Sequence, residues 1–239
     1  AMTISQGIVN ICLEMYVKMA ALIGAILWNL FTWWRGIPSS SSHALIGGLI
    51  GASIVYTAGT ENIIWSGVLE KVVIPLFTSP IVGFLIGFLF MKSIFKIFIE
   101  WSQRKVNKVF LKLQIFSSAF VAFSHGNNDA QKTMGIITLA LITGGILDES
   151  TGVPLWVKFT CAITMALGTS LGGWKIMKTM GGSVTKLEPA SGFAAQTTSA
   201  IVIESMTFFG APVSTTQVIT TSIMGVGSAK RVTSVKWGI

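Results

Sequence analysis

The chain has 239 residues and a formal charge of +8, but only 11% of its residues are charged and 51% are hydrophobic. Its mean hydropathy is +0.72. An ordinary soluble domain has about 25% charged residues, so these values exclude a soluble enzyme, a disordered chain and an exposed solenoid. They indicate a polytopic helical membrane protein whose cations lie in short connections, following the positive-inside bias. We therefore expect a lipid bilayer around the chain and no nucleic-acid partner.

The first half of the chain contains apolar segments of unequal length. Residues 15–34 and 72–99 are long enough to cross a membrane, whereas the apolar run 44–58 is shorter. A polar stretch, residues 36–43, separates the segments 15–34 and 44–58. Residues 92–112 carry a dense cluster of Lys and Arg, which places this connection in the cytoplasm.

The second half contains a segment that is too long for one simple crossing. As a single helix, residues 113–143 would measure about 46 Å, against a hydrocarbon core of about 30 Å. The polar run 124–132 lies inside this segment, so the sequence predicts a broken helix there. Residues 155–177 form another apolar span. The weaker apolar segments 187–209 and 218–228 are separated by the polar residues 210–217.

The charges flanking these segments predict how the hairpins enter the membrane. The last pair of segments begins beside Lys186 and ends at Lys230-Arg231, so both of its ends are expected in the cytoplasm. This pair is then a re-entrant hairpin with its tip at 210–217. The same reasoning makes the region around 36–43 a second re-entrant hairpin, which enters from the opposite face.

The two hairpin tips are related in sequence. Gly36-x-Pro38-x-Ser40-Ser41-Ser42-His43 aligns with Gly210-x-Pro212-x-Ser214-Thr215-Thr216-Gln217 at a constant offset of 174 in residue number, and Gly51 falls on Gly225. Similar segments of opposite orientation are typical of inverted-topology repeats, whose interrupted helices form a substrate site near the bilayer midplane. We predict an all-α polytopic membrane protein with inverted repeats, two re-entrant helical hairpins and broken transmembrane helices.

The repeat also divides the chain. Residues 1–91 form a first repeat with its tip at 36–43, and residues 92–112 are the basic connection. Residues 113–239 form a second repeat with a helix break at 124–132 and a tip at 210–217. The polar run around Asn128 has no counterpart at the offset that relates the tips. We therefore expect the first repeat to be incomplete and the chain to be part of a longer protein.

Each tip has the composition of an anion site. A Pro followed by Ser or Thr residues opens a short helix, whose free backbone N–H groups and hydroxyls lie at the positive end of the helix dipole. Two such ends meeting at the midplane suit a small oxyanion such as phosphate or sulfate. A serine-rich linker or an ordinary pair of helix caps is the alternative interpretation.

The polar run 124–132 carries the other candidate chemistry. A carboxylate inside a membrane segment is costly and therefore marks function by default, and Asp129 suits a bound cation or a proton. Asn127, Asn128 and Gln131 offer carbonyl and amide groups. Lys132 lies three residues from Asp129 on the same side of the helix, so a purely structural Asp–Lys pair is the alternative. Glu204 is a candidate proton-coupling carboxylate, with a polar packing contact as its alternative.

These motifs resemble those of the inorganic phosphate transporter family. The family has a Gly-Ala-Asn-Asp-x-Ala-Asn motif and a Pro-Val-Ser-Thr-Thr-His hairpin tip in each of two inverted halves. Gly126-Asn127-Asn128-Asp129 matches the first motif, and residues 212–216 and 38–43 match the second. Residues 124–126 and 131–135 are similar to the family's bacterial members. The resemblance covers essentially the whole chain.

The resemblance implies a secondary transporter that moves inorganic phosphate, coupled to sodium or protons, by alternating access in a bacterial plasma membrane. It implies that the phosphate lies between the tips, against Ser40, Ser41, Ser42, Asn128, Ser214, Thr215 and Thr216. The implied coupling residues are Asp129, Asn127, Gln131, Lys132 and Glu204. Asp129 is also the candidate sodium ligand. No other cofactor is expected, and assembly of several copies is left open.

Two departures from the family pattern affect the coupling ion. Lys132 replaces the last Asn of the motif, and its ammonium group can take the place of a sodium ion beside Asp129; we therefore favour proton coupling. Gln217 replaces the His of the tip. Sulfate transport by the same fold and anion binding without transport are the remaining alternatives. An enzyme is not expected, because no nucleophile–base set or metal-ligand cluster is present in the sequence.

Overall fold

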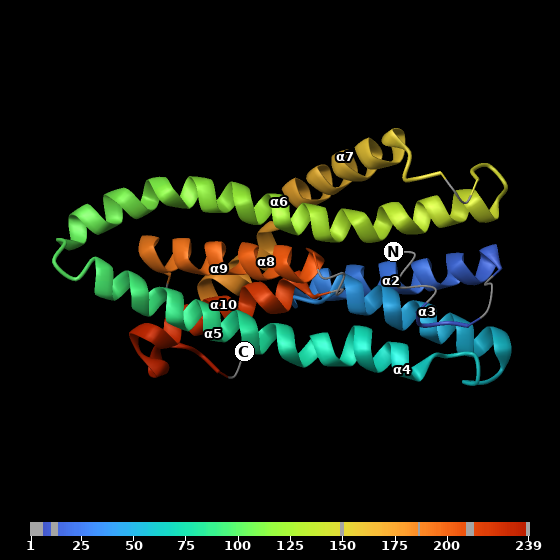
Figure 1. The fold of residues 1–239 in the computed structure, drawn as a ribbon, viewed down its shortest axis with the longest axis horizontal. Helices are drawn as coiled ribbons and strands as arrows, with labels where there is room; N and C mark the ends of the chain where they lie inside the picture. The colour runs from blue at the N-terminus through green and yellow to red at the C-terminus, as the bar shows by residue number, and fades with distance from the viewer. Residues whose placement is uncertain (1–6, 11–13, 149–150, 186, 209–212, 238–239) are drawn as a thin grey trace. The chain divides into compact units, whose positions relative to one another are not determined.

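The computed structural model describes residues 7–10, 14–148, 151–185, 187–208 and 213–237, and it is built from helices (Figure 1). The β-type pairing in these residues is one isolated antiparallel bridge between Val9 and Ile63. Four described helical stretches are long and apolar enough to cross a membrane: Met15–Arg35, Trp65–Ile97, Gln103–Thr143 and Leu155–Gly172. These observations agree with the predicted all-α polytopic class.

The first helical hairpin consists of α2 (Met15–Arg35) and α3 (Ser41–Thr57), which lie side by side. α2 ends at Gly36, whose positive φ of 69° is a left-handed conformation that glycine adopts at little cost. The N–H groups of Gly36 and Ile37 donate to the carbonyl oxygens of Trp33 and Thr32. This arrangement closes the helix end and turns the chain into the tip.

The next apolar segment is a continuous helical rod. It contains the short helix α4 (Trp65–Val68), a π-helical turn η1 (Leu69–Val73) and α5 (Ile74–Ile97). The rod therefore begins earlier than the predicted span 72–99. Pro80 lies inside α5.

The predicted break at 124–132 is wrong, because α6 (Gln103–Thr143) runs through this region as one α-helix of 41 residues. The polar residues do not need to leave the helix. Ser124, Asn128 and Lys132 are spaced four residues apart, so they share one helical face, and all three are buried. Because packing covers that face, the polar run is accommodated without losing helical hydrogen bonds.

An interruption occurs instead in the following segment. α7 (Leu155–Gly172) ends before Gly173, and the chain resumes as α8 (Trp174–Lys178) and a π-helical turn η2 (Thr179–Ser183). The predicted span 155–177 is therefore two helices. The break falls at a Gly-Gly pair, where the backbone has the least intrinsic preference to continue a helix.

The second helical hairpin consists of α9 (Pro189–Phe208) and α10 (Thr215–Lys230), followed by a 3₁₀ turn η3 (Val232–Ser234). The starts of α2 and α9, at positions 15 and 189, are related by the offset of 174, and so are the starts of α3 and α10, at positions 41 and 215. The helix starts thus repeat with the same offset as the sequence. Residues 210–212 of the predicted tip lie outside the described residues.

The chain forms two compact units, and each contains one hairpin. The first unit comprises residues 1–75 and 126–173, and the second comprises residues 76–125 and 174–239. The hairpin α2–α3 belongs to the first unit and α9–α10 to the second. α6 contributes to both, because the boundary falls between His125 and Gly126, inside the polar run. The repeat boundaries at 91 and 113 describe sequence symmetry and stay a prediction.

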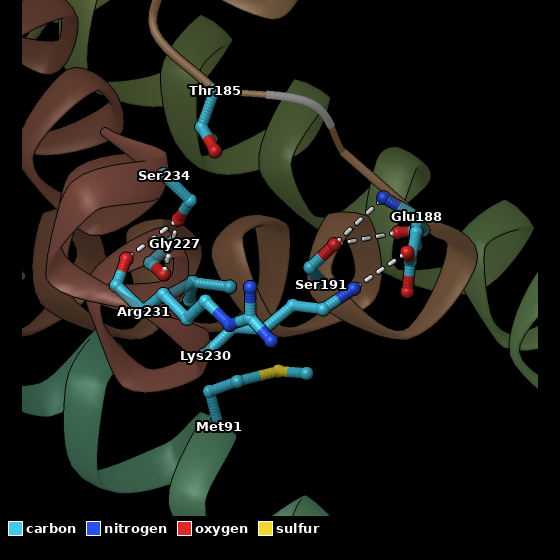
Figure 2. A pocket seen from close by; sticks show the side chains of 9 residues that line it. Met91, Thr185, Glu188, Ser191, Gly227, Lys230, Arg231 and Ser234 are labelled. Carbon is cyan, nitrogen blue, oxygen red and sulfur yellow. Dashed lines mark hydrogen bonds and ion pairs between the residues drawn. The ribbon is translucent and has the colours of Figure 1, made fainter. Parts of the chain in front are cut away.

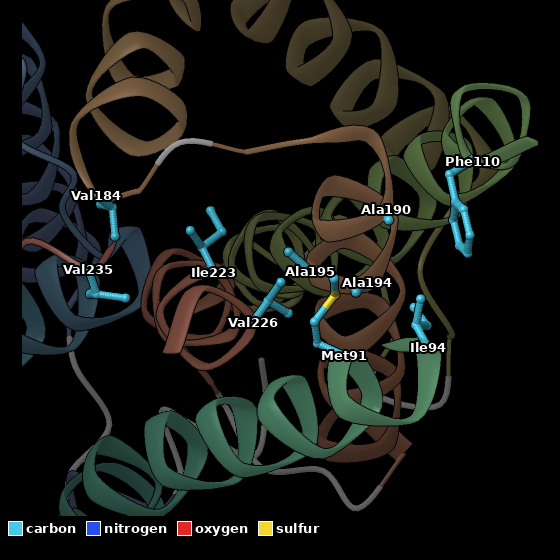
Figure 3. Packing of buried hydrophobic residues seen from close by; sticks show 10 residues of the cluster. All are labelled: Met91, Ile94, Phe110, Val184, Ala190, Ala194, Ala195, Ile223, Val226 and Val235. Atoms are coloured by element: carbon cyan, nitrogen blue, oxygen red, sulfur yellow. The ribbon is translucent and has the colours of Figure 1, made fainter. Parts of the chain in front are cut away.

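The second unit has the larger hydrophobic core, shown in Figure 3. Met91 and Ile94 of α5 pack with residues of α9 and α10, and Phe110 of α6 is almost completely buried. Two glycines bring the backbones together. A side chain at Gly225 would overlap the carbonyl group of Phe84, and one at Gly87 would lie 2.8 Å from the carbonyl oxygen of Ser222. Close backbone approach at small residues is a common way for helices to associate in membranes.

The first unit has a smaller core. Ile8, Val9, Val17 and Ile46 are buried together. Gly48 of α3 lies directly against the backbone carbonyl of Ala21 in α2, so the two helices of the first hairpin are also in close contact. In each hairpin the two helices are therefore packed against each other as a pair.

Candidate functional site

The first tip is shaped by a helix cap. Ser40 has an extended backbone, and its Oγ accepts a hydrogen bond of 3.3 Å from the N–H of His43. Ser39 Oγ lies 2.9 Å from Thr32 Oγ1, which connects the tip to the end of α2. Because α3 begins at Ser41, the hydroxyl of Ser42 lies in its first turn, and Ser42 is only 3% exposed.

The second tip repeats this cap. Ser214 is also extended, and its Oγ accepts a hydrogen bond of 3.3 Å from the N–H of Gln217. Ser214 and Thr215 are buried, and Thr216 is partly buried. Each tip therefore has the same polar helix start, with first-turn N–H groups at the positive end of the helix dipole. Such helix ends attract anions.

The polar run on α6 presents two sets of side chains. Asn128 and Lys132 are buried, whereas Gln131 is exposed. Gln131 Nε2 donates to Asn127 Oδ1 at 3.0 Å, so these two candidates bond to each other along the helix. Asn128 Nδ2 lies 3.4 Å from Asp129 Oδ1. The run thus supplies a buried set, which consists of Asn128, Asp129 and Lys132, and a more exposed Asn127–Gln131 pair.

Lys132 joins this buried set to the first tip. Its Nζ donates to Asp129 Oδ1 at 3.0 Å and also donates a short hydrogen bond to Ser42 Oγ. The side chains of Lys132 and Asp129 are 9% and 16% exposed. A buried charge is stable only when it is paired and hydrogen-bonded, and both conditions are met here. The structure thus brings together three of the predicted site residues, Ser42, Asp129 and Lys132.

A cavity of about 550 Å³ lies beside this group within the first unit. Its polar lining includes Ser41, Asp129, Lys132 and Asn29, and most of the remaining lining is apolar. The cavity is far larger than the share of about 30 Å³ that one water molecule occupies in the liquid. The Asp129–Lys132 pair therefore borders a space large enough for a small ion.

The second hairpin contains a different set of buried polar atoms. One carboxylate oxygen of Glu204, Oε1, is buried and has no hydrogen-bond partner in the described part of the chain. The same is true of Gln217 Oε1 and of the hydroxyls of Thr198 and Ser222. Buried polar atoms are normally bonded, so such exceptions call for a proton, a water molecule or a ligand.

The predicted site residues are divided between the two units. Ser40, Ser41, Ser42, Asn128 and Asp129 belong to the first unit, whereas Ser214, Thr215, Thr216 and Glu204 belong to the second. The meeting of the two tips at one phosphate therefore stays a prediction. Within the described residues, no three His, Cys, Asp or Glu side chains gather closely enough to hold a metal ion. A sodium ion at Asp129 would need neutral oxygen atoms as its other ligands.

Sequence reasoning missed one contact of this site. The spacing of Asp129 and Lys132 indicated their pairing, but the contact of Lys132 with Ser42 joins residues 90 positions apart. The signal that could have pointed to it is the four-residue spacing of Ser124, Asn128 and Lys132. This spacing marks a packed face, although it does not identify the element that packs there.

Comparisons with known proteins show which family the chain resembles. A family model described as "Phosphate transporter family" matches residues 1–239. A Bacillus subtilis protein named "Probable low-affinity inorganic phosphate transporter" is 48% identical over 222 residues, which are 93% of this chain and 66% of that protein. A Mycobacterium bovis protein of the same name is 42% identical over 241 residues, which are 100% of this chain and 58% of that protein.

A solved structure, "The sodium-dependent phosphate transporter", has the same fold, with a TM-score of 0.80 and 24% identity. The alignment covers 99% of this chain and 78% of that one. The chain spans 66% of the length of the Bacillus subtilis relative and 58% of the length of the Mycobacterium bovis relative. Their names describe transporters and not enzymes, and their bacterial origin fits a multi-pass protein of the plasma membrane. Since the family model matches from the first residue to the last, the chain belongs to the phosphate transporter family.

Proposed function

We propose that this chain carries the substrate site of a secondary transporter that moves inorganic phosphate across the bacterial plasma membrane. The observation that carries the proposal is the buried group of Lys132, Asp129 and Ser42 at the start of α3. A buried cation beside a capped helix start is a place where an anion gains both charge-assisted hydrogen bonds and the helix dipole. The names of the bacterial relatives support phosphate as that anion.

In the proposed site, the first tip binds one side of the phosphate. Ser41 and Ser42 donate through their hydroxyls, and Asn128 donates through its amide. The second tip contributes Ser214, Thr215 and Thr216 from the equivalent helix start. In the free protein Lys132 already bonds to Ser42, so an arriving phosphate shares or replaces this bond. Alternating access then carries the phosphate between the two faces of the membrane.

Asp129 favours phosphate over sulfate in this arrangement. At neutral pH phosphate retains a proton that it can donate, whereas sulfate has none, and a carboxylate is a strong acceptor. Sulfate transport by the same fold stays the alternative, but a carboxylate beside the anion would disfavour sulfate. Anion binding without transport is a second alternative, because the chain is shorter than the relatives that it matches.

For the coupling ion we propose the proton, with sodium as the alternative. The ammonium group of Lys132 lies 3.0 Å from Asp129 Oδ1 and already neutralises the carboxylate that a sodium ion would use. Glu204, with a buried oxygen that lacks a partner in the described part of the chain, is the proposed proton carrier of the second unit. The name of the solved relative supports sodium as the alternative.

Equilibrium binding to the purified chain in detergent tests the substrate. Radiolabelled phosphate should bind and resist competition by sulfate, and Asp129→Asn should weaken both the binding of phosphate and this selectivity. Asp148→Asn is the matched control, because it makes the same chemical change in an exposed loop. A folded chain that binds no phosphate, or that binds sulfate equally well, would overturn the proposal for this chain.

The same assay in sodium and in choline buffers tests the coupling ion. Proton coupling predicts that phosphate binding by the unmodified chain does not depend on sodium. Lys132→Asn restores the family's motif residue and should introduce a saturable sodium dependence. A sodium requirement in the unmodified chain would instead establish the alternative. Counterflow of labelled phosphate in proteoliposomes then separates transport from binding alone.

A further inference from the structure

A second polar pocket lies within the second unit, at the end of its hairpin away from the tip. Its volume is about 400 Å³, and it is formed where α9 begins and α10 ends (Figure 2). Figure 2 shows the side chains of Lys230 and Arg231 extending into this pocket, with Glu188 and Ser191 beside them. The predicted topology places this end of the hairpin in the cytoplasm.

Most polar groups of this pocket already have partners. Lys230 Nζ lies 2.7 Å from Glu188 Oε1. Ser191 Oγ accepts from the N–H of Glu188 and donates to its carbonyl oxygen. Ser234 Oγ donates to the carbonyl oxygens of Gly227 and Arg231. The hydroxyls therefore hold the backbone of the pocket in place, and Lys230 and Glu188 pair with each other.

Arg231 is the exception. Its guanidinium group has five donors, and none has a side-chain or backbone partner among the described residues. With Lys230 positive and Glu188 negative, Arg231 leaves the pocket with one excess positive charge. A guanidinium group recognises phosphate through two parallel hydrogen bonds, so the pocket has the chemistry to bind a phosphate group.

The repeat shows that the fold does not require these charges. At the offset of 174, Lys230 and Arg231 correspond to Tyr56 and Thr57 of the first hairpin. There Tyr56 packs edge-on against Tyr16, with ring centroids 5.8 Å apart. An aromatic pair thus occupies the end of one hairpin, and an ion pair with an additional Arg occupies the end of the other. Hairpin packing therefore does not require the cations, which also mark the predicted cytoplasmic end of this hairpin.

We infer that this pocket is a second binding site for a phosphate group, with Arg231 as its main ligand. Lys230 is the second ligand, and it exchanges Glu188 for the phosphate when the site is filled. The phosphate group is that of inorganic phosphate or of a phosphomonoester lipid such as phosphatidic acid. The inference does not depend on the transport proposal, because it concerns different residues.

Binding to the full chain carrying Asp129→Asn tests this inference, since that change weakens the proposed substrate site. Two probes are used: labelled inorganic phosphate in detergent, and phosphatidic acid added to phosphatidylcholine nanodiscs. Arg231→Gln should weaken binding of the preferred probe about tenfold to a hundredfold, as expected for charge-assisted hydrogen bonds. Glu188→Gln should tighten it about two- to fivefold, because it releases Lys230 from an exposed ion pair.

Lys236→Gln is the matched control, because Lys236 is an exposed cation of the same segment and does not line the pocket. Arg231-dependent binding of either probe supports the inference, and the probe that binds identifies the source of the phosphate group. Absence of binding of both probes, or equal weakening by Arg231→Gln and Lys236→Gln, overturns it. In the otherwise unmodified chain, binding at the substrate site is weakened by Asp129→Asn but not by Arg231→Gln, so the two proposals fail separately.

Discussion

The two hairpin tips have the same backbone design but different charged neighbours. Ser40 and Ser214 cap their helices with the same hydrogen bond, of 3.3 Å in each case. Beside the first tip, Lys132 and Asp129 form a buried ion pair. In the second hairpin, Glu204 has a buried oxygen without a partner in the described part of the chain. The repeat thus duplicates the means of binding an anion, whereas the charged residues that suit ion coupling differ between the halves.

The largest expected effect comes from breaking the ion pair of the first half. Lys132→Met leaves Asp129 buried without its cation, and removing one partner of a buried pair costs about 3–5 kcal/mol. Unfolding of the purified chain in detergent, followed by tryptophan fluorescence, measures this loss. The double variant Lys132→Met/Asp129→Asn should regain most of the stability, because no isolated charge remains.

Lys158→Met serves as the control for this experiment, since Lys158 is exposed. A loss of less than about 1 kcal/mol on Lys132→Met would match a solvent-exposed pair and would contradict the burial of the group. Such a result would remove the main physical difference between the two tips.

The next largest effect on stability is expected at one of two glycines that occupy equivalent positions in the two hairpins. Gly225→Ala should destabilise the chain by about 1–3 kcal/mol, because its Cβ would overlap the carbonyl group of Phe84 and overpacking costs energy of this order. Gly51 is the same position in the first hairpin, and its surroundings within 4 Å are open. Gly51→Ala should be neutral or stabilise the helix by up to about 1 kcal/mol.

Parallel unfolding measurements on these two variants give a direct comparison of the hairpins. Equal losses at both positions would mean that α3 is packed against another element as closely as α10 is packed against α5. The predicted inequality instead limits close helix packing at this repeat position to the second half.

A smaller effect tests what the tips have in common. Ser40→Ala and Ser214→Ala should each cost about 1 kcal/mol of stability, within the usual range for losing a helix cap. Glycine at either position should cost only a few tenths of a kcal/mol. Clearly unequal losses, measured by the same unfolding assay against Ser93→Ala, would contradict the equivalence of the two caps.

The sequence predicted the parts of this molecule that local patterns encode. The sequence predicted that a Pro followed by Ser or Thr residues opens a helix in each tip, and α3 and α10 begin at Ser41 and Thr215. The constant offset between the tips relates them without any structure. The sequence could not predict that α6 continues through 124–132, because the continuity of this helix depends on which of its faces is packed. The contact of Lys132 with Ser42 and the pairing of Glu188 with Lys230 join residues 90 and 42 positions apart. Periodicity does not identify such partners.

The smallest expected effect concerns the carboxylate of the second half. Glu204→Gln keeps the shape of the side chain and removes a charge whose oxygen Oε1 has no bond in the described residues. Its effect on the free energy of unfolding should therefore stay within about 0.5 kcal/mol of zero, or be stabilising, because desolvating the charge no longer costs energy. Asp129→Asn, assayed beside it, should be destabilising, since it leaves Lys132 buried without its anion. A loss on Glu204→Gln as large as that expected for a broken buried ion pair would show that Glu204 also has a charged partner, and the two halves would then hold their carboxylates in the same way.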